Sequence, residues 1–143
     1  MDCCNPKALL KENGIRATRK KVAILGCIIA SDAPLSAQEI HRRVSSPMNL
    51  DIVTVYRTLS TFKEASVVRD IRISTGTQYY EMACDHNPLH PHFLCTSCSR
   101  MSCLRSLKGI ETEYFSGFAD DCEVDEISIT ITGICPECLE AVR

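Results

Sequence analysis

The sequence predicts an α+β fold in which a winged helix-turn-helix is followed by a small α+β domain. Three observations carry this prediction: apolar residues recur at helical spacing over residues 6–65, they alternate with a period of two over residues 67–82, and the second half holds two C-x-x-C pairs. Prolines mark a linker near residues 85–91, so we expect one domain over residues 1–84 and a second over residues 85–143. Each would be close to the size at which a hydrophobic core alone is barely sufficient.

Turn and capping signals separate the first three predicted helices. Residues 6–13 form a short amphipathic helix that Gly14 ends, and Thr18 can cap a second helix with an apolar inner face. Ser36 is the expected N-cap of the third helix, with Glu39 at the third helical position as in a capping box. A short connection between two such helices is typical of a helix-turn-helix.

The fourth helix is expected over residues 49–65, and a hairpin follows it. We place three apolar side chains on the inner face of this helix: Val53, Leu59 and Phe62. Strands over residues 67–73 and 78–82 flank a Ser-Thr-Gly-Thr turn, which predicts the wing of a winged helix. For the second domain we expect three strands and one helix, over residues 93–95, 101–104, 127–134 and 110–118.

Four cysteines in the second half have the spacing of a metal site: Cys95, Cys98, Cys135 and Cys138. Two C-x-x-C pairs can supply four thiolates to a closed, tetrahedral structural zinc ion. The intervening residues 99–134 outnumber those of a simple zinc ribbon, so a small domain must fold back to unite the pairs. Two disulfides or a redox dithiol are the alternative interpretations.

Composition and charge restrict the partners. The chain lacks an apolar run of membrane-spanning length and an export signal, so we expect a cytoplasmic protein without a membrane partner. The overall charge of −2 hides an asymmetry, because residues 1–83 carry +4 and residues 84–143 carry −6. Only the first half is therefore suited to a polyanion, although such charges also simply solvate helix faces.

The start of the fourth helix carries candidate DNA-reading residues. Arg57 can bind guanine with two hydrogen bonds, Tyr56 can pack on a thymine methyl, and Thr54 and Thr58 can reach phosphates. The alternative interpretation is a helix that does not contact DNA, in which Tyr56 belongs to the core and Arg57 is only solvated. Contacts to the DNA backbone or minor groove are expected from four further cations: Arg16, Arg19, Lys20 and Lys21.

A second set of candidate ligands surrounds His90 and His92. Their spacing within an extended segment puts both imidazoles on one side of the chain, where one ion can take both. Cys84, Glu81 and Asp70 can approach from the wing hairpin and complete a mixed set of sulfur, nitrogen and oxygen ligands. Two exposed histidines without a role and an inert buried Cys84 are the alternatives.

Together these motifs resemble the ferric uptake regulator superfamily of bacterial metal-dependent repressors over nearly the whole chain. The resemblance rests on residues 14–19 (GIRATR), 36–40 (SAQEI) and 54–59 (TVYRTL), on His90-x-His92 and on the two C-x-x-C pairs. It implies a homodimer, a winged helix on a double-stranded DNA operator and a C-terminal dimerisation domain that the four cysteines staple with zinc. It also implies a sensory divalent metal at the hinge, which would link the two domains.

The zinc-sensing branch of this superfamily looks closest, because its ligands match Asp70, Cys84, His90 and His92 in order and spacing. Iron and peroxide sensors carry a histidine where this chain has Pro34 and an acid where it has Cys103. Glu81 nevertheless matches the wing glutamate of the family, so it and Cys103 are further candidate ligands.

The function expected from the sequence is a zinc-sensing repressor that binds palindromic operators as a metal-loaded dimer. We expect it to lack catalytic residues and a small organic substrate. The alternatives are an iron- or peroxide-sensing repressor, with Fe²⁺ or Mn²⁺ as the regulatory metal, and a thiol-based redox protein.

Overall fold

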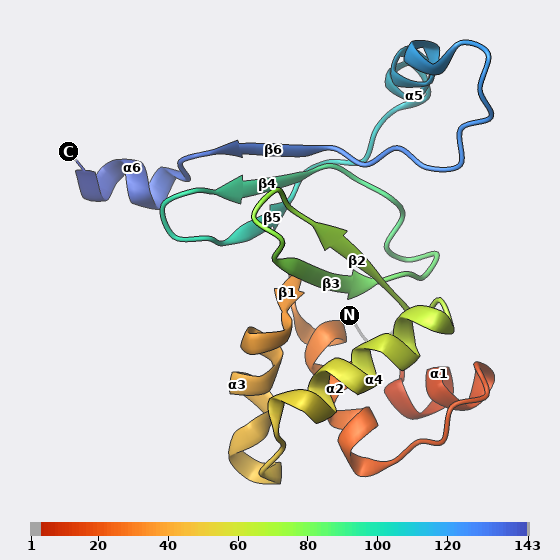
Figure 1. Cartoon of the computed structure of the whole chain (residues 1–143), viewed down its shortest axis with the longest axis vertical. Helices are drawn as coiled ribbons and strands as arrows, with labels where there is room; N and C mark the ends of the chain where they lie inside the picture. The colour runs from red at the N-terminus through yellow and green to blue at the C-terminus, as the bar shows by residue number, and fades with distance from the viewer. Residues whose placement is uncertain (1–3, 143) are drawn as a thin grey trace. The chain divides into compact units, whose positions relative to one another are not determined.

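The chain folds into two compact units that divide between Asn87 and Pro88. The structure, a computed structural model, describes residues 4–142. Figure 1 labels the helices and strands of both units, and each unit is described below by itself. No helix within residues 4–142 combines the length and the apolar character needed to cross a membrane.

The N-terminal unit contains four helices and a three-stranded sheet. The helices are α1 (Pro6–Glu12), α2 (Arg19–Ala30), α3 (Ala37–Met48) and α4 (Ile52–Glu64). The strands are β1 (Leu35–Ser36), β2 (Val68–Arg72) and β3 (Gln78–Met82), in the order β1-β3-β2. This arrangement is the predicted winged helix, with the β2–β3 hairpin as its wing.

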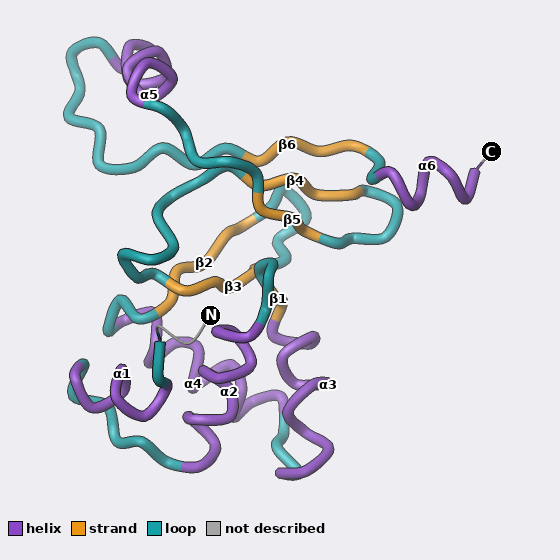
Figure 2. The backbone as a smooth tube through the Cα atoms, turned by 180° about the vertical axis from the view of Figure 1, so that it is seen from behind, coloured by secondary structure: helices purple, strands orange, loops and turns teal. Residues whose placement is uncertain are grey.

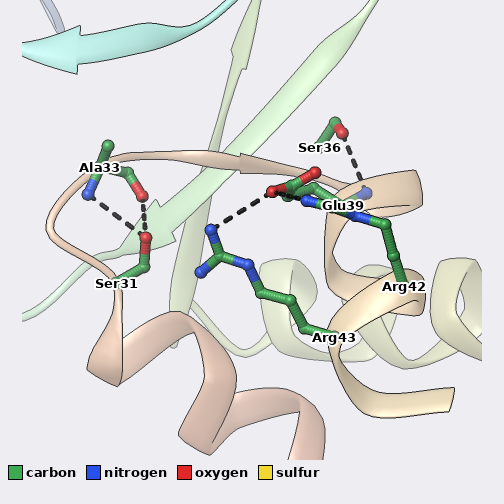
Figure 3. Close-up of polar contacts among 6 residues, drawn as sticks. All are labelled: Ser31, Ala33, Ser36, Glu39, Arg42 and Arg43. Atoms are coloured by element: carbon green, nitrogen blue, oxygen red, sulfur yellow. Dashed lines mark hydrogen bonds and ion pairs between the residues drawn. The ribbon is translucent and has the colours of Figure 1, made fainter. Parts of the chain in front are cut away.

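Local side-chain hydrogen bonds set the helix starts as the sequence predicts. Thr18 Oγ1 accepts from the N–H of Lys21 at 3.3 Å, and Ser36 Oγ accepts from the N–H of Glu39 at 3.2 Å. The Glu39 carboxylate also accepts hydrogen bonds from Arg42 and Arg43, one helical turn further along (Figure 3).

The α2–α3 connection is also closed by a side chain. Ser31 Oγ donates to the Ala33 carbonyl at 2.6 Å and accepts from the Ala33 N–H at 3.3 Å, as Figure 3 shows. β1 follows at once and pairs Leu35 with Tyr80 of β3. This strand was not predicted, because two residues are too few to show a period.

Helix α4 begins three residues later than predicted. Asn49 has a left-handed backbone conformation (φ 49°) that ends α3, and Asp51 then caps α4 by accepting from the N–H of Thr54. Leu59 and Phe62 are fully buried as expected, but Val53 is 51% exposed. The expectation for Val53 was wrong.

The helical period explains this error. Val55, Leu59 and Phe62 recur at i, i+4 and i+7 and define the buried face of α4. At 100° per residue, position 53 lies about 200° from position 55, on the opposite face.

The C-terminal unit is built on a second three-stranded sheet. Its elements are β4 (His92–Cys95), β5 (Met101–Cys103), α5 (Gly109–Ser116), the 3₁₀ turn η1 (Gly117–Ala119), β6 (Thr130–Gly133) and α6 (Pro136–Val142). The strand order is β5-β4-β6 (Figure 2). β4 is antiparallel to β5 and parallel to β6. The last strand is shorter than predicted, and helix α6 was not predicted.

Helix α5 buries none of its side chains, and both views show it apart from the sheet of its own unit (Figures 1 and 2). Ile110 is 76% exposed, and Tyr114 and Phe118 are also exposed. Tyr114 instead packs edge-on against Phe115 and Phe118. The unit therefore exposes several large apolar side chains to solvent.

Candidate metal centres and nucleic-acid interface

The sheet of the C-terminal unit brings the two C-x-x-C pairs together. Cys95 ends β4, and the parallel pairing of β4 with β6 sets Cys95 opposite Gly133, two residues before Cys135. Cys98 lies in the turn after β4, and Cys138 lies in the first turn of α6. The four Sγ atoms all lie within 4.8 Å of one another. The folding back that the long spacing predicted is thus achieved by strand pairing.

The sulfur spacing suits a tetrahedral ion. With metal–sulfur distances of about 2.3 Å, the edges of a sulfur tetrahedron are about 3.8 Å. The Sγ atoms of Cys98 and Cys135 are 3.9 Å apart. An ion pair between Arg100 and Glu137 also links the segments that carry the two C-x-x-C pairs. The N–H and the hydroxyl of Thr96 both donate to the Gly133 carbonyl and join the same two segments.

Electrostatics within this four-cysteine cluster suit a bound cation. Backbone N–H groups of Cys135 and Cys98 donate to Cys95 Sγ and lower the pKa of the Cys95 thiol to about 6. The neighbouring Cys135 raises the pKa of the Cys138 thiol to about 12. Four thiols this close cannot all ionise by themselves, so a divalent cation is the group that their chemistry fits.

A second cluster in the C-terminal unit contains His90, His92 and Cys103. His92 pairs directly with Cys103 across β4 and β5, and the rings of His90 and His92 lie 4.5 Å apart. His92 is buried, whereas Cys103 is exposed. The metal-ligating atoms of the three residues lie within 4.8 Å of one another.

A hydrogen bond prepares His90 to bind a metal through one nitrogen. His90 Nδ1 lies 2.7 Å from the carbonyl of Pro88, so Nδ1 carries the proton and donates it. In this tautomer the Nε2 lone pair is the one available to an ion, as is typical of metal-binding histidines.

Asp70 is surrounded by donors from its own unit. Its carboxylate is 3.1 Å from Lys63 Nζ and 3.2 Å from Arg72 Nε, and it accepts from Gln78 Nε2 at 3.0 Å. Partial burial acts to raise the pKa of Asp70, but the hydrogen bonds and charge of Lys63 outweigh it, with help from Gln78 and Arg72, and lower the pKa. A metal would have to displace these donors to use Asp70 as a ligand.

The remaining two wing candidates also have partners in the N-terminal unit. Glu81 is buried and forms an ion pair with Arg69 at 2.8 Å, and Arg69 Nη2 donates to the carbonyl of Asn87. Cys84 lies 3.8 Å, sulfur to sulfur, from Cys4. This proximity was not predicted, because no local sequence signal connects residues that are 80 positions apart.

One face of α4 is exposed and holds both residues that the sequence predicts to contact bases. Tyr56 and Arg57 lie on it, at i+3 and i+4 from the exposed Val53, and Tyr56 is 40% exposed. Gln38 Nε2 of α3 donates to Tyr56 Oη at 3.1 Å, and this hydrogen bond fixes the orientation of the Tyr56 side chain. Thr58, by contrast, is only 5% exposed and points into the core, which removes it from the phosphate contacts that the sequence predicted.

The same period identifies two exposed residues that the sequence analysis missed, Val53 and Ser60. Counting back from the apolar positions Leu59 and Phe62 could have found both. Thr54 is half-buried, at the edge of this face.

The predicted backbone-contacting cations gather at the start of α2. Arg16, Arg19 and Lys20 are exposed, and Lys21 is half-buried. The first turn of α2 contains no acid, although the N-terminus of a helix disfavours cations. These charges therefore do not stabilise the helix, whereas a phosphate at this position would meet both the cations and the helix dipole.

One unit is a winged helix with an exposed face on α4, and the other contains clustered metal ligands. Together these features define a class of protein, the metal-dependent, DNA-binding regulators. The model of the Ferric uptake regulator family matches residues 12–117, so the chain belongs to this family. As a member, the protein is a metal-binding, DNA-binding transcriptional repressor.

Relatives and solved structures of the family cover most of the chain. It is 28% identical over 130 residues to the peroxide-responsive repressor PerR of Staphylococcus saprophyticus, covering 90% of this chain and 86% of that protein. Its fold is similar to that of the Vibrio cholerae ferric uptake regulator (TM-score 0.74, 21% identity, 90% of this chain and 98% of that one). It is also similar to a zinc-bound manganese uptake regulator (TM-score 0.75, 20% identity, 92% and 99% covered).

These matches confirm the predicted family and the α+β fold. They include a repressor named for peroxide and regulators named for ferric iron and manganese uptake, so the assignment to the zinc-sensing branch stays a prediction.

Proposed function

We propose that this protein is a zinc-sensing repressor that holds its regulatory ion on His90, His92 and Cys103 of the C-terminal unit. The observation that carries the proposal is the placement of a thiol, Cys103, beside two imidazoles. A thiolate and two imidazoles with room for one more ligand suit tetrahedral Zn²⁺, whereas Fe²⁺ and Mn²⁺ sites use more oxygen and nitrogen ligands.

The four-cysteine cluster is proposed to hold a second, structural zinc ion. All four ligands are thiolates, and a closed set of this kind contributes folding energy instead of sensing. The four-cysteine site would therefore stabilise the fold, and the site on His90, His92 and Cys103 would respond to the zinc concentration.

The position of His90 suggests how metal binding reaches the DNA-binding unit. His90 is three residues after Asn87, the last residue of the N-terminal unit, and its Nδ1–H donates a hydrogen bond to the Pro88 carbonyl. An ion on His90 and His92 restrains the first residues after the boundary. Fewer conformations of this connection would raise DNA affinity without any new protein–DNA contact.

The DNA target is proposed to be a palindromic operator bound by a homodimer. Arg57 and Tyr56 would contact base edges, and Arg16, Arg19 and Lys20 would contact the backbone. The exposed apolar side chains of the C-terminal unit, such as Ile110, Tyr114 and Phe118, support burial against a second copy. In such a dimer the two recognition helices would lie about 34 Å apart, one helical turn of DNA.

The test is DNA binding as a function of metal. DNA that the zinc-loaded protein selects from a random library serves as the operator, and its affinity is measured with Zn²⁺, Fe²⁺ and Mn²⁺ in turn. We expect zinc to give the tightest binding and Cys103→Ser to lose the zinc response. Cys122→Ser is the matched control, because Cys122 is an exposed cysteine outside both of the metal-ligand clusters described above. An unchanged zinc response in Cys103→Ser would contradict the proposal.

Peroxide sensing is the second candidate, and the similarity to PerR of Staphylococcus saprophyticus favours it. It predicts that the wild type responds to Fe²⁺ or Mn²⁺ and that hydrogen peroxide releases the iron-loaded protein from DNA. Cys103→Asp separates the candidates, since a carboxylate in place of the thiolate should weaken the zinc response and strengthen the iron response only if Cys103 is a ligand.

A further inference from the structure

A third group of metal ligands lies within the N-terminal unit and comprises Cys4, Cys84 and His86. We propose that these three residues bind a thiophilic divalent cation, Zn²⁺, at a site separate from the four-cysteine cluster and from His90, His92 and Cys103. The proposal itself does not depend on which metal the protein senses; only the zinc count expected for His92→Ala rests on the proposed function.

The spacing of the ligand atoms supports an ion between them. The Sγ atoms of Cys4 and Cys84 are 3.8 Å apart, which equals the edge of about 3.8 Å expected for two thiolates on one tetrahedral zinc ion. The imidazole of His86 places a nitrogen within 4.8 Å of both sulfurs. The four-cysteine cluster shows nearly the same sulfur–sulfur separation, 3.9 Å.

The charges of this donor set also suit Zn²⁺. Two thiolates cancel the charge of the ion, and the neutral imidazole adds none. A half-buried site can therefore hold the complex without leaving a net charge away from water. Three protein ligands leave the fourth tetrahedral position to water or to another side chain.

Cys84 and His86 are held in a closed turn after β3. The Asn87 N–H donates to the Cys84 carbonyl at 2.9 Å, and Asn87 Nδ2 donates to the Met82 carbonyl at 2.8 Å. Arg69 anchors the same turn through its bond to the Asn87 carbonyl. The turn presents both ligands from one short, braced segment, as metal sites require.

Cys4 is positioned by the start of α1. The next residue, Asn5, is the N-cap and accepts from the N–H of Ala8 at 3.1 Å. Leu10 of the same helix is fully buried in the core, so α1 is fixed to the unit and carries Cys4 with it. Cys4 therefore directly precedes a packed helix, and Cys84 lies in the turn that follows β3.

An ion at this site would join two segments that are 80 residues apart in the sequence. It would tie the start of α1 to the end of β3 and restrict the unfolded chain as a cross-link does. The expected consequence is a more stable N-terminal unit when zinc is bound.

The experiment counts zinc ions in the full-length, reduced protein by elemental analysis after gel filtration. Cys4→Ser, Cys84→Ser and His86→Ala should each lose one ion per chain, and His92→Ala should lose a different one. The double variant Cys4→Ser/His92→Ala should therefore lose two. Cys27→Ser is the control, because Cys27 is half-buried in the same unit but outside the cluster, and it should keep every ion. His86 is exposed, so His86→Ala should fold normally, which circular dichroism verifies.

Three outcomes would overturn the proposal. The first is a full zinc content in Cys4→Ser and His86→Ala. The second is that Cys84→Ser and His92→Ala lose the same ion, so that their double variant is no worse than either, which would assign Cys84 to the regulatory site. The third is loss of the ion in Cys3→Ser but not in Cys4→Ser, which would move the ligand by one residue. A failure of the zinc response in DNA binding, with this ion retained, would contradict the proposed function alone.

Discussion

Arg57 offers a direct test of the proposed DNA-reading face. The side chain is exposed on α4, beside Tyr56, so Arg57→Ala should change the free energy of unfolding by no more than about 0.5 kcal/mol. A bidentate contact between arginine and guanine contributes about 1–3 kcal/mol of discrimination. Because a dimer on a palindrome makes the contact twice, the expected loss of binding free energy is about 2–6 kcal/mol, or roughly 30-fold to more than 10⁴-fold in affinity.

The assay is fluorescence anisotropy with selected operator DNA and scrambled DNA at several salt concentrations. Lys20→Ala is the matched control, because Lys20 is an equally exposed cation at the start of α2. Loss of a phosphate contact in each subunit should lower the salt dependence of log K by about 1.8 and weaken both DNAs alike. Equal losses on operator and scrambled DNA for Arg57→Ala would refute its role as a base-reading residue.

Three further predictions concern stability and metal. Cys98→Ser should lose the structural ion and unfold the C-terminal unit, because the binding of a structural zinc ion contributes about 10 kcal/mol or more to folding. Cys122→Ser should keep both the ion and the fold, and metal analysis and circular dichroism measure these two properties. Leu59→Ala should destabilise the N-terminal unit by about 2–5 kcal/mol because Leu59 is fully buried, while Val53→Ala should cost less than about 0.5 kcal/mol in urea unfolding. The folded-state pKa of Asp70 is lowered, so its contribution is present above the unfolded pKa of about 3.9 and is lost as pH falls through the folded value. Asp70→Asn should therefore destabilise the protein at pH near 7 but approach the wild type in strong acid, and a constant difference across that range would contradict the assignment.

Short-range signals allowed the sequence to predict most of the fold. The Thr18 and Ser36 caps, the β2–β3 hairpin and the two C-x-x-C pairs each depend on residues within a few positions of one another. Their hydrogen bonds and periodicities are local, so they are readable without knowing the path of the chain. The family resemblance rested on the same local motifs.

The face of α4 shows where local reasoning needed the core. Val53 and Thr58 were assigned by residue type, apolar inward and hydroxyl outward, and the structure reverses both. Which face of a helix is buried depends on what packs against it. Here the fully buried Val55, Leu59 and Phe62 define the inner face of α4. Position relative to this face, and not residue type, determines that Val53 is exposed and Thr58 is buried.

The composition of the metal clusters was decided by tertiary structure. By itself the sequence determined the kinds of ligand, the presence of both C-x-x-C pairs in one domain and the winged helix of the first half. It could not determine that strand pairing sets Cys103 opposite His92, or that the start of α1 brings Cys4 to Cys84. Metal sites collect ligands that are close in space, and closeness between residues far apart in the chain arises only when burial and strand register have chosen one path for the backbone.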